Sequence, residues 1–313
     1  MTNVKAIRHA YGPKLATLGE TNKDIIVLDA DVSSSTQSHY FAKAHPERFY
    51  NFGIAEANMV SAAAGLATMG KIPVVNTFSF LLCERSLDQI TRGIAYNKLN
   101  VKLAANYGGM SDSFDGASHH STTDISIMRT IPNVTTVVIS DTVQMEKALP
   151  AIIDHDGCVY FRMCRAETPI VHNDDLEFKL GKGITLKDGS DITIIATGIL
   201  VSRALKAAEQ LKKDGVDARV VEIHTIKPID KELIQKCALE TGAIVTCEEG
   251  LINGGLGSAV LESIESNPVP VSRVGIDDCF TQTGPYDTLL NHYGMSIENI
   301  AEKSKELCVN KNR

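Results

Sequence analysis

The 313-residue chain contains no tryptophan, and aromatic residues make up only 5% of it. So few rings argue against a carbohydrate-stacking platform or a surface that stacks single-stranded nucleic acid. Basic side chains are also outnumbered, with 31 Lys and Arg against 38 Asp and Glu, which gives a net charge of −7. We expect neither nucleic acid nor a membrane as a partner, because an acidic chain has no general attraction for either.

Several motifs that would identify other protein classes are also missing. The seven cysteines are odd in number and none are spaced as C-x-x-C, which argues against a zinc knuckle or a disulfide framework. Residues 1–10 lack the apolar core of a signal peptide, and apolar runs elsewhere are only as long as a strand. P-loop, zinc-protease and hydrolase-elbow motifs do not occur. We therefore expect a cytoplasmic protein without a membrane span.

The sequence does contain a regular alternation of short β-branched runs and longer amphipathic stretches. This alternation is typical of α/β proteins with a parallel, doubly wound sheet. In the first part of the chain it predicts strands at 24–31, 49–52, 72–78, 101–105, 135–139 and 159–163, and helices at 36–44, 55–69, 83–96 and 143–153.

The alternation pauses between residues 166 and 190, where glycine, proline and acidic residues predict a connection with little regular structure. A second unit then predicts strands at 192–198, 218–223, 243–248 and 269–276, and helices at 201–213, 231–241, 256–266 and 296–307. We therefore predict two doubly wound α/β domains with mainly parallel sheets, at 1–170 and 191–313, joined by a linker at 171–190.

Ligands in open α/β sheets bind beyond the carboxyl ends of the strands, and polar residues follow several strands here. Glu56 opens an Ala-rich helix just after a strand. The helix dipole alone favours a carboxylate there, and the functional alternative is acid–base work on a bound ligand. A long polar loop, 106–120, ends in the adjacent His119 and His120, which would point apart. Hydrogen bonding to a small polar molecule therefore fits better than a metal site, and we predict no metal ligands.

Other polar groups near strand ends leave two interpretations open. Arg8, Arg162 and Arg165 are candidates for ordinary surface ion pairs. The serine-rich segment 33–36 is either a helix cap or an anion site at a helix N-terminus. The glycine-rich segment 254–257 precedes a helix but lacks the full dinucleotide-binding pattern, which favours a structural role.

Taken together, the short motifs resemble the C-terminal half of transketolase over essentially the whole chain. The matching segments are Arg8-His-Ala-Tyr-Gly, Leu28-Asp-Ala-Asp, Ser35-Thr, His45-Pro-Glu-Arg-Phe, Gly53-Ile-Ala-Glu-Ala-Asn-Met-Val, Thr77-Phe, Asp115-Gly-Ala-Ser-His, Ser140-Asp, Thr225-Ile-Lys-Pro-Ile-Asp and Gly254-Gly-Leu-Gly. Each is weak alone, but their common order is a strong signal. The resemblance implies a pyrimidine-binding domain, then the transketolase C-terminal domain, with thiamine diphosphate bound between two chains.

The resemblance also implies roles for residues around the cofactor. Glu56 stands where the family's glutamate hydrogen-bonds the aminopyrimidine ring and so helps to remove the thiazolium proton. His119 would lie near the cofactor's amino group, and Phe78 would form part of the pyrimidine pocket. The family's stacking aromatic aligns with Leu81, with Phe80 beside it, and we predict that Phe80 takes that role.

The same resemblance implies a substrate site. Asp115 would recognise a substrate hydroxyl, and Arg8, Ser35 and Arg165 match positions that hold the sugar phosphate. Tyr107 stands in place of a substrate-binding histidine, and Phe114 replaces an acidic residue. We therefore expect sugar phosphate substrates but do not assume the usual pentose and heptulose phosphates.

The sequence motif that holds the diphosphate and Mg²⁺ in transketolases is missing. Transketolases hold Mg²⁺ on the diphosphate through a G-D-G motif and a later asparagine, and no G-D-G occurs in this chain. The resemblance therefore implies a separate N-terminal subunit with the Mg²⁺ ligands, and a heterotetramer of two copies of each chain. Two alternatives remain: the β subunit of a 2-oxoacid dehydrogenase, which the Glu56 segment, Arg8 and Arg165 disfavour, and a non-catalytic regulatory subunit of the same fold. A 1-deoxyxylulose phosphate synthase is disfavoured because it carries both halves in one chain.

Overall fold

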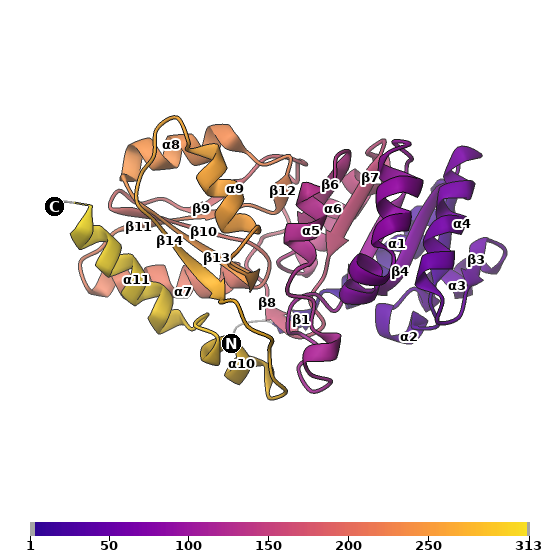
Figure 1. The fold of residues 1–313 in the computed structure, drawn as a ribbon, viewed down its shortest axis with the longest axis horizontal. Helices are drawn as coiled ribbons and strands as arrows, with labels where there is room; N and C mark the ends of the chain where they lie inside the picture. Colours follow the sequence, from indigo (N-terminus) through magenta and orange to yellow (C-terminus); the bar gives the residue numbers. More distant parts are fainter. Residues whose placement is uncertain (1–3, 312–313) are drawn as a thin grey trace.

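The first part of the chain forms a seven-stranded sheet in the order β12-β6-β7-β5-β4-β2-β3. The computed structural model describes residues 4–311 and shows this sheet in one of two lobes that lie side by side (Figure 1). The strands are β2 (Ile25–Asp29), β3 (Phe49–Asn51), β4 (Ile72–Phe78), β5 (Lys102–Asn106), β6 (Val134–Val138), β7 (Cys158–Arg162) and β12 (Thr225–Lys227). Register places Phe78 opposite Asn106, so β4 and β5 end at the same edge.

Helices cover both faces of this sheet because successive side chains of each strand point to opposite faces. Val27 packs with α1 (Arg8–Thr21) and α6 (Thr142–Asp154) in one buried cluster. Leu28, the next residue, belongs to a second cluster with α4 (Glu56–Thr68) and the π-helical segments η2 (Leu81–Arg85) and η3 (Gln89–Ala95). Burial on both faces explains why these strands are continuous apolar runs.

The second lobe has a five-stranded sheet in the order β14-β13-β10-β11-β9. Its strands are β9 (Ile184–Lys187), β10 (Ile192–Ala196), β11 (Ala218–Glu222), β13 (Ile244–Leu251) and β14 (Val271–Ile276), and its helices are α7 (Leu200–Lys213), α8 (Lys231–Thr241), α9 (Leu256–Ser263), α10 (Tyr286–His292) and α11 (Ile297–Asn310). Both sheets are mainly parallel, as predicted. The exceptions are β9 and β12, which pair antiparallel at sheet edges.

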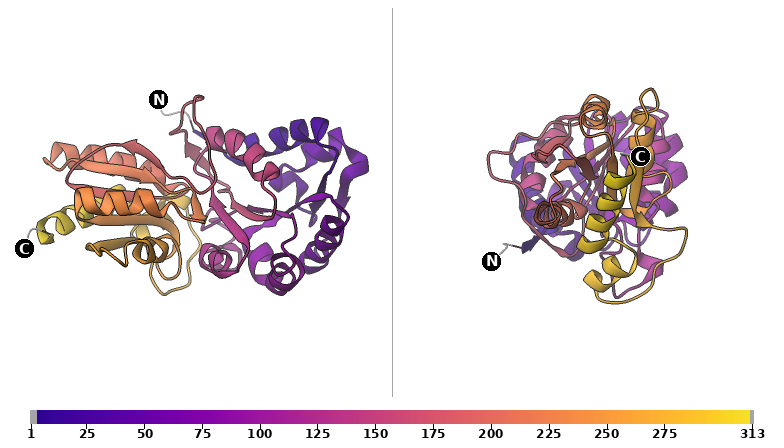
Figure 2. Two further views of the ribbon diagram at one scale, coloured as in Figure 1. Left: turned by 90° about the horizontal axis from the view of Figure 1, so that it is seen from above. Right: turned by 90° about the vertical axis from the view of Figure 1, so that its left-hand side faces the viewer.

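Two features of the fold connect the lobes, which Figure 2 shows from above and from one end. Strand β12 leaves the second part of the chain to complete the first sheet beside β6. Strands β1 (Val4–Ala6) and β8 (Glu167–Pro169) form a separate antiparallel ribbon within the first part of the chain. The second connecting feature is a buried ionic cluster at the junction, described next.

The buried cluster centres on His172, in the connection that follows β8. His172 Nδ1 donates to Asp141 Oδ2 at 2.9 Å, and Nε2 donates to Glu222 Oε2 at 2.8 Å. Asp141 caps α6 in the first lobe, whereas Glu222 ends β11 in the second. Burial opposes ionisation of the imidazole, but hydrogen bonds and the charges of both carboxylates outweigh it and raise the pKa of His172 to about 10. A protonated imidazole therefore bridges two buried carboxylates across the lobes.

Local structure departs from prediction where the backbone takes unusual conformations. The helix predicted at 36–44 is two short helices, α2 (Ser33–Thr36) and α3 (His39–Ala44), because Gln37 adopts a left-handed φ of +67° between them. The helix predicted at 83–96 is π-helical and interrupted. Helices α5 (Asp124–Thr130) and α10 and strands β1 and β12 were not predicted, and strands β8 and β9 lie in the connection for which little regular structure was expected. Among residues 4–311, no helix has the length and apolar character to cross a bilayer.

Candidate active site

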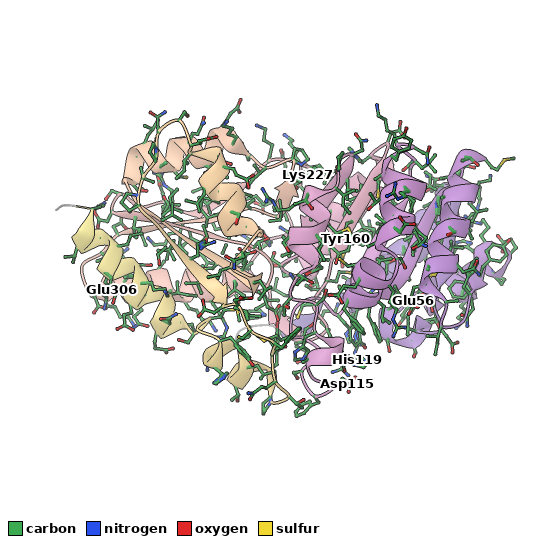
Figure 3. The ribbon with its side chains drawn as sticks, in the orientation of Figure 1. Glu56, Asp115, His119, Tyr160, Lys227 and Glu306 are labelled. Atoms are coloured by element: carbon green, nitrogen blue, oxygen red, sulfur yellow. The ribbon has the colours of Figure 1, made fainter. Side chains whose placement is uncertain are left out.

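Most of the predicted site residues gather at the edge where β4 and β5 end. In Figure 3, Glu56, Asp115 and His119 lie toward the lower side of the first lobe, and Lys227 lies toward the upper side. Phe78 ends β4, and Tyr107 directly follows β5. A sheet edge of this kind is where open α/β folds bind their ligands.

Glu56 lies in the first turn of α4 and is only 3% exposed. Its Oε2 atom is 3.7 Å from Arg85 Nη1, but its Oε1 atom is buried without a hydrogen-bond partner. A buried acceptor left unpaired costs about 1–3 kcal/mol. Such a carboxylate is suited to accept a hydrogen bond from a ligand, or to share a proton with it.

Aromatic side chains pair where strands β4 and β5 end. Phe78 and Tyr107 are stacked, with ring centroids 4.3 Å apart and planes inclined by 26°. Phe80 contacts the His119 ring at a centroid distance of 5.1 Å. Leu81, next in the chain, is 9% exposed and begins η2. The contact with His119 belongs to Phe80, the residue that the sequence favoured as the aromatic of the pocket.

Two arginines converge on the Tyr107 ring. Arg8 Nη1 donates to Tyr107 Oη at 2.8 Å and to the Ser35 backbone carbonyl at 3.0 Å. The Arg165 guanidinium lies 5.2 Å from the ring centroid. Tyr107 itself adopts a left-handed φ of +61°, a strained conformation for an aromatic residue. Ser35 thus positions Arg8 through its backbone carbonyl, and Tyr107 holds both cations at one place, where an anionic group would bind.

The loop after β5 carries three acidic or imidazole groups toward this site. Asp115 is exposed, and His119 Nδ1 lies 3.0 Å from Ser118 Oγ. Asp112 is buried, and its Oδ1 atom lies 3.5 Å from Arg165 Nε. Burial, and then the negative charge of Asp115, raise the pKa of Asp112 to about 6. Sequence reasoning missed Asp112 because it belongs to no motif, and only its ion pair with Arg165 marks it.

His120 has different contacts from His119 and helps to attach the loop to the second lobe. Its Nδ1 atom lies 2.7 Å from Thr281 Oγ1, and burial lowers the pKa of the His120 imidazole. The backbone N–H of Gly284 donates to the Ser113 carbonyl at 3.2 Å. The two adjacent histidines therefore contact different parts of the protein: His119 contacts Phe80 and Ser118, whereas His120 contacts Thr281 of the second lobe.

Glu249, on β13, anchors the start of the same loop. Its Oε1 atom accepts a 2.7 Å hydrogen bond from the Met110 N–H, and its Oε2 atom lies 3.7 Å from Arg162 Nη2 on β7. Gly109 has a φ of +64°, and a Cβ there would lie only 2.2 Å from the Glu249 carboxyl carbon. Arg162 is thus a buried partner of Glu249 and Asp124, contrary to the surface ion pair considered from the sequence.

We expect Glu249→Ala to lower the free energy of unfolding by about 3 kcal/mol, because it leaves Arg162 with less buried counter-charge and the Met110 N–H without an acceptor. Urea unfolding measures the stability change, and hydrogen exchange measures opening of residues 108–121. Glu265→Ala, at an exposed position, is the matched control. Unchanged exchange of the loop amides would show that Glu249 does not hold the loop.

The glycine-rich segment at 254–257 has the structural role that the sequence favoured. The Glu248 carboxylate accepts hydrogen bonds from Leu256 N at 2.8 Å and from Gly257 N at 2.9 Å. A Cβ on Gly255 would lie 1.9 Å from Glu248 Oε2. An internal carboxylate therefore fills the N-terminus of α9, where a phosphate would otherwise bind.

Comparison with known families agrees with this arrangement. Residues 4–170 match the transketolase pyrimidine-binding domain, and residues 181–300 match the transketolase C-terminal domain. The chain belongs to the transketolase family. The motif resemblance is thereby confirmed, and so is the expected pair of mainly parallel α/β sheets. The pyrimidine-binding match includes every predicted site residue, from Arg8 to Arg165.

Three similar proteins match over nearly the whole chain. The 6-deoxy-6-sulfo-D-fructose transketolase subunit SqwH of Clostridium sp. (strain MSTE9) is 40% identical over 307 residues, covering 98% of this chain and 95% of its own. One of the subunits of the apulose-4-phosphate transketolase of Phocaeicola vulgatus is 40% identical over 305 residues, covering 97% and 98%. A solved structure described as a split gene transketolase, inactive beta4 tetramer, has 42% identity and a TM-score of 0.90, covering 99% and 100%.

Other members of the family are about twice as long. The transketolase of Rattus norvegicus is 37% identical over 307 residues, which cover 96% of this chain but 49% of the rat protein. The chain is thus similar from end to end to single subunits of split transketolases, and to about half of the rat enzyme.

Proposed function

We propose that this chain is the C-terminal subunit of a split transketolase. With a separate diphosphate-binding subunit, it would transfer a two-carbon ketol unit from a ketose phosphate to an aldose phosphate. The observation that carries the proposal is the buried, unpaired Oε1 of Glu56 at the ligand-binding edge of a pyrimidine-binding fold.

The residues present fit thiamine diphosphate. Glu56 would accept a hydrogen bond from the aminopyrimidine and hold a proton there. Phe78, Phe80 and Leu81 would border the ring, and His119 would lie near its amino group. When bound, the cofactor supplies the nucleophilic carbon that attacks a ketose carbonyl. The ligands of Mg²⁺ are expected on the partner subunit, because this chain has no G-D-G motif.

The substrate would bind between the cofactor and the converging arginines. Asp115 would accept a hydrogen bond from a sugar hydroxyl, and Arg8 and Arg165 would bind the phosphate, with Ser35 and Tyr107 positioning Arg8. The relatives named for sulfofructose and apulose phosphate act on different sugars, so the family does not restrict this chain to pentose phosphates.

The assembly would be a cytoplasmic heterotetramer with two copies of each subunit. The chain spans about half of the rat transketolase, and the similar split-gene protein is described as an inactive beta4 tetramer. Both observations support a requirement for a second kind of chain. Within this chain we propose a pyrimidine-binding domain at 1–170, a linker at 171–190 and a C-terminal domain at 191–313.

Reconstitution tests the proposal directly. The purified chain is mixed with the diphosphate-binding subunit, thiamine diphosphate and Mg²⁺, and ketol transfer between a ketose phosphate and an aldose phosphate is measured. We expect turnover only when both subunits are present, because each carries half of the cofactor site. Transfer by this chain alone would contradict the split arrangement. Decarboxylation of a 2-oxoacid by the mixture would identify a dehydrogenase subunit, and turnover of neither substrate would point to a regulatory chain.

A further inference from the structure

The region that would bind the anionic end of a substrate already contains an internal anion. Asp112 Oδ1 lies 3.5 Å from Arg165 Nε, and the two side chains differ in exposure, at 5% for Asp112 and 42% for Arg165. The guanidinium therefore reaches the open side of the site while the carboxylate lies beneath it. A buried carboxylate cannot turn into solvent to make room for a ligand, so any anion that binds Arg165 must accept Asp112 as a neighbour.

The charges around Asp112 come from three parts of the fold. Arg8 on α1 and Arg165 after β7 contribute two positive charges, and Tyr107 links them. On the loop after β5, Asp115 raises the pKa of the Asp112 carboxyl, whereas His119 and Arg165 lower it. At a pKa of about 6, Asp112 is mostly ionised at pH 7, so it cancels about one of the two positive charges of Arg8 and Arg165, and the negative charge of Asp115 lowers the local charge further.

The size of this net charge affects which anion binds well. Attraction to a fixed positive charge grows in proportion to the charge of the ligand, whereas the cost of removing the ligand from water grows more steeply, with the square of its charge. A site whose positive charge is reduced by an internal carboxylate offsets the desolvation of a monoanion better than that of a dianion. The same site without that carboxylate would favour the dianion more strongly.

We infer that Asp112 is a specificity-determining residue whose carboxylate competes with the anionic end of the substrate for Arg165, so that singly charged ends are favoured relative to doubly charged ones. This inference rests on the proposed function, since it takes Arg8 and Arg165 to be the residues that hold the end of the sugar. The ligand chemistry is a monoanionic oxyanion, either a sulfonate or a phosphate monoester that retains one proton.

Protonation of Asp112 would be coupled to anion binding. A sulfonate does not titrate near neutral pH, so any pH dependence of its binding reports groups on the protein. A phosphate monoester loses its second proton near pH 6, so its own charge changes over the same range. Methanesulfonate therefore isolates the contribution of the protein, and methyl phosphate measures the response to a dianion.

The test is calorimetric titration of the full chain with methanesulfonate and with methyl phosphate at pH 7.5. The variants are Asp112→Asn, which keeps the shape of the side chain, and Asp112→Ala, which cannot donate a hydrogen bond to the ligand. Asp175→Asn removes the same charge from an exposed position in the linker and serves as the control. Circular dichroism checks that each variant is folded.

We expect both Asp112 variants to bind methyl phosphate about tenfold more tightly than the unsubstituted chain, and methanesulfonate only about threefold more tightly. In the unsubstituted chain, methanesulfonate should bind more tightly as pH falls from 7.5 to 5.5, because Asp112 loses its charge. That dependence should be smaller in both variants, because the Asp112 carboxyl is absent from them. Equal gains for the two ligands, no gain, or an unchanged pH dependence would overturn the inference.

The same experiment separates this inference from the proposed function. Anion binding is measured without ketol transfer, so the predicted change in selectivity together with an inactive reconstituted complex would retain the role of Asp112 and reject the enzymatic assignment. An active complex in which substitution of Asp112 leaves the anion selectivity unchanged would retain the enzymatic assignment and reject the role of Asp112. In an active complex, the two variants should also lower the KM for a phosphate-ended ketose more than they change kcat.

Discussion

Replacing Glu56 by glutamine should reduce ketol transfer by the reconstituted complex by roughly 10²–10⁴-fold, the usual contribution of a positioned acid–base group. The amide has nearly the same shape as the carboxylate, but it cannot hold or release a proton at the buried Oε1 position. The loss should appear in kcat, because the change affects the chemical step more than substrate binding.

The matched control for Glu56 is Glu20→Gln, the same substitution at an exposed position of α1. Analytical ultracentrifugation and cofactor titration show whether the Glu56 variant still assembles and binds thiamine diphosphate. Loss of turnover with assembly retained would support a catalytic role. Turnover equal to that of the control would reject Glu56 as the acid–base group.

Replacing His172 by glutamine should lower the free energy of unfolding by about 3–5 kcal/mol, as expected when one partner of a buried ionic cluster is removed. The imidazolium lies between Asp141 and Glu222, and the variant would leave both carboxylates buried without their counter-charge. Because the two acids belong to different lobes, the junction between the lobes should open first. Urea unfolding measures the stability, and hydrogen exchange of residues 171–173 locates the opening.

The effect of His172 should depend on pH in a defined direction. Its folded-state pKa of about 10 is above the unfolded value of 6.5, so its stabilising contribution is complete below about pH 6.5 and is lost as pH rises toward 10. The stability difference between the unsubstituted chain and His172→Gln should therefore shrink between pH 7 and pH 10. His9→Gln, at an exposed position of α1, is the control. A difference that stays constant over this range would show that the imidazole is not protonated.

Sequence periodicity predicted the fold class well because burial on both faces imposes a continuous apolar pattern on each strand. Strands such as β2, β5 and β7 needed no knowledge of their neighbours to be recognised. Periodicity did not predict elements whose structure depends on a neighbouring strand or on an unusual backbone conformation. Strand β12 is three residues long and forms only because β6 offers an open edge, and α2 and α3 are separated by the left-handed Gln37.

For the site too, the sequence revealed local motifs but not the contacts between residues distant in the chain. The order of motifs along the chain by itself identified the family and selected Glu56, Phe80 and Arg165, because such motifs are local strings of residues. Only the tertiary structure decided that Asp112 pairs with Arg165, that Glu249 of the second lobe anchors the loop, and that His172 bridges the lobes. These contacts join residues distant in the chain, and no local pattern encodes them. The electrostatic attraction between these groups becomes strong only when folding buries them together, away from water.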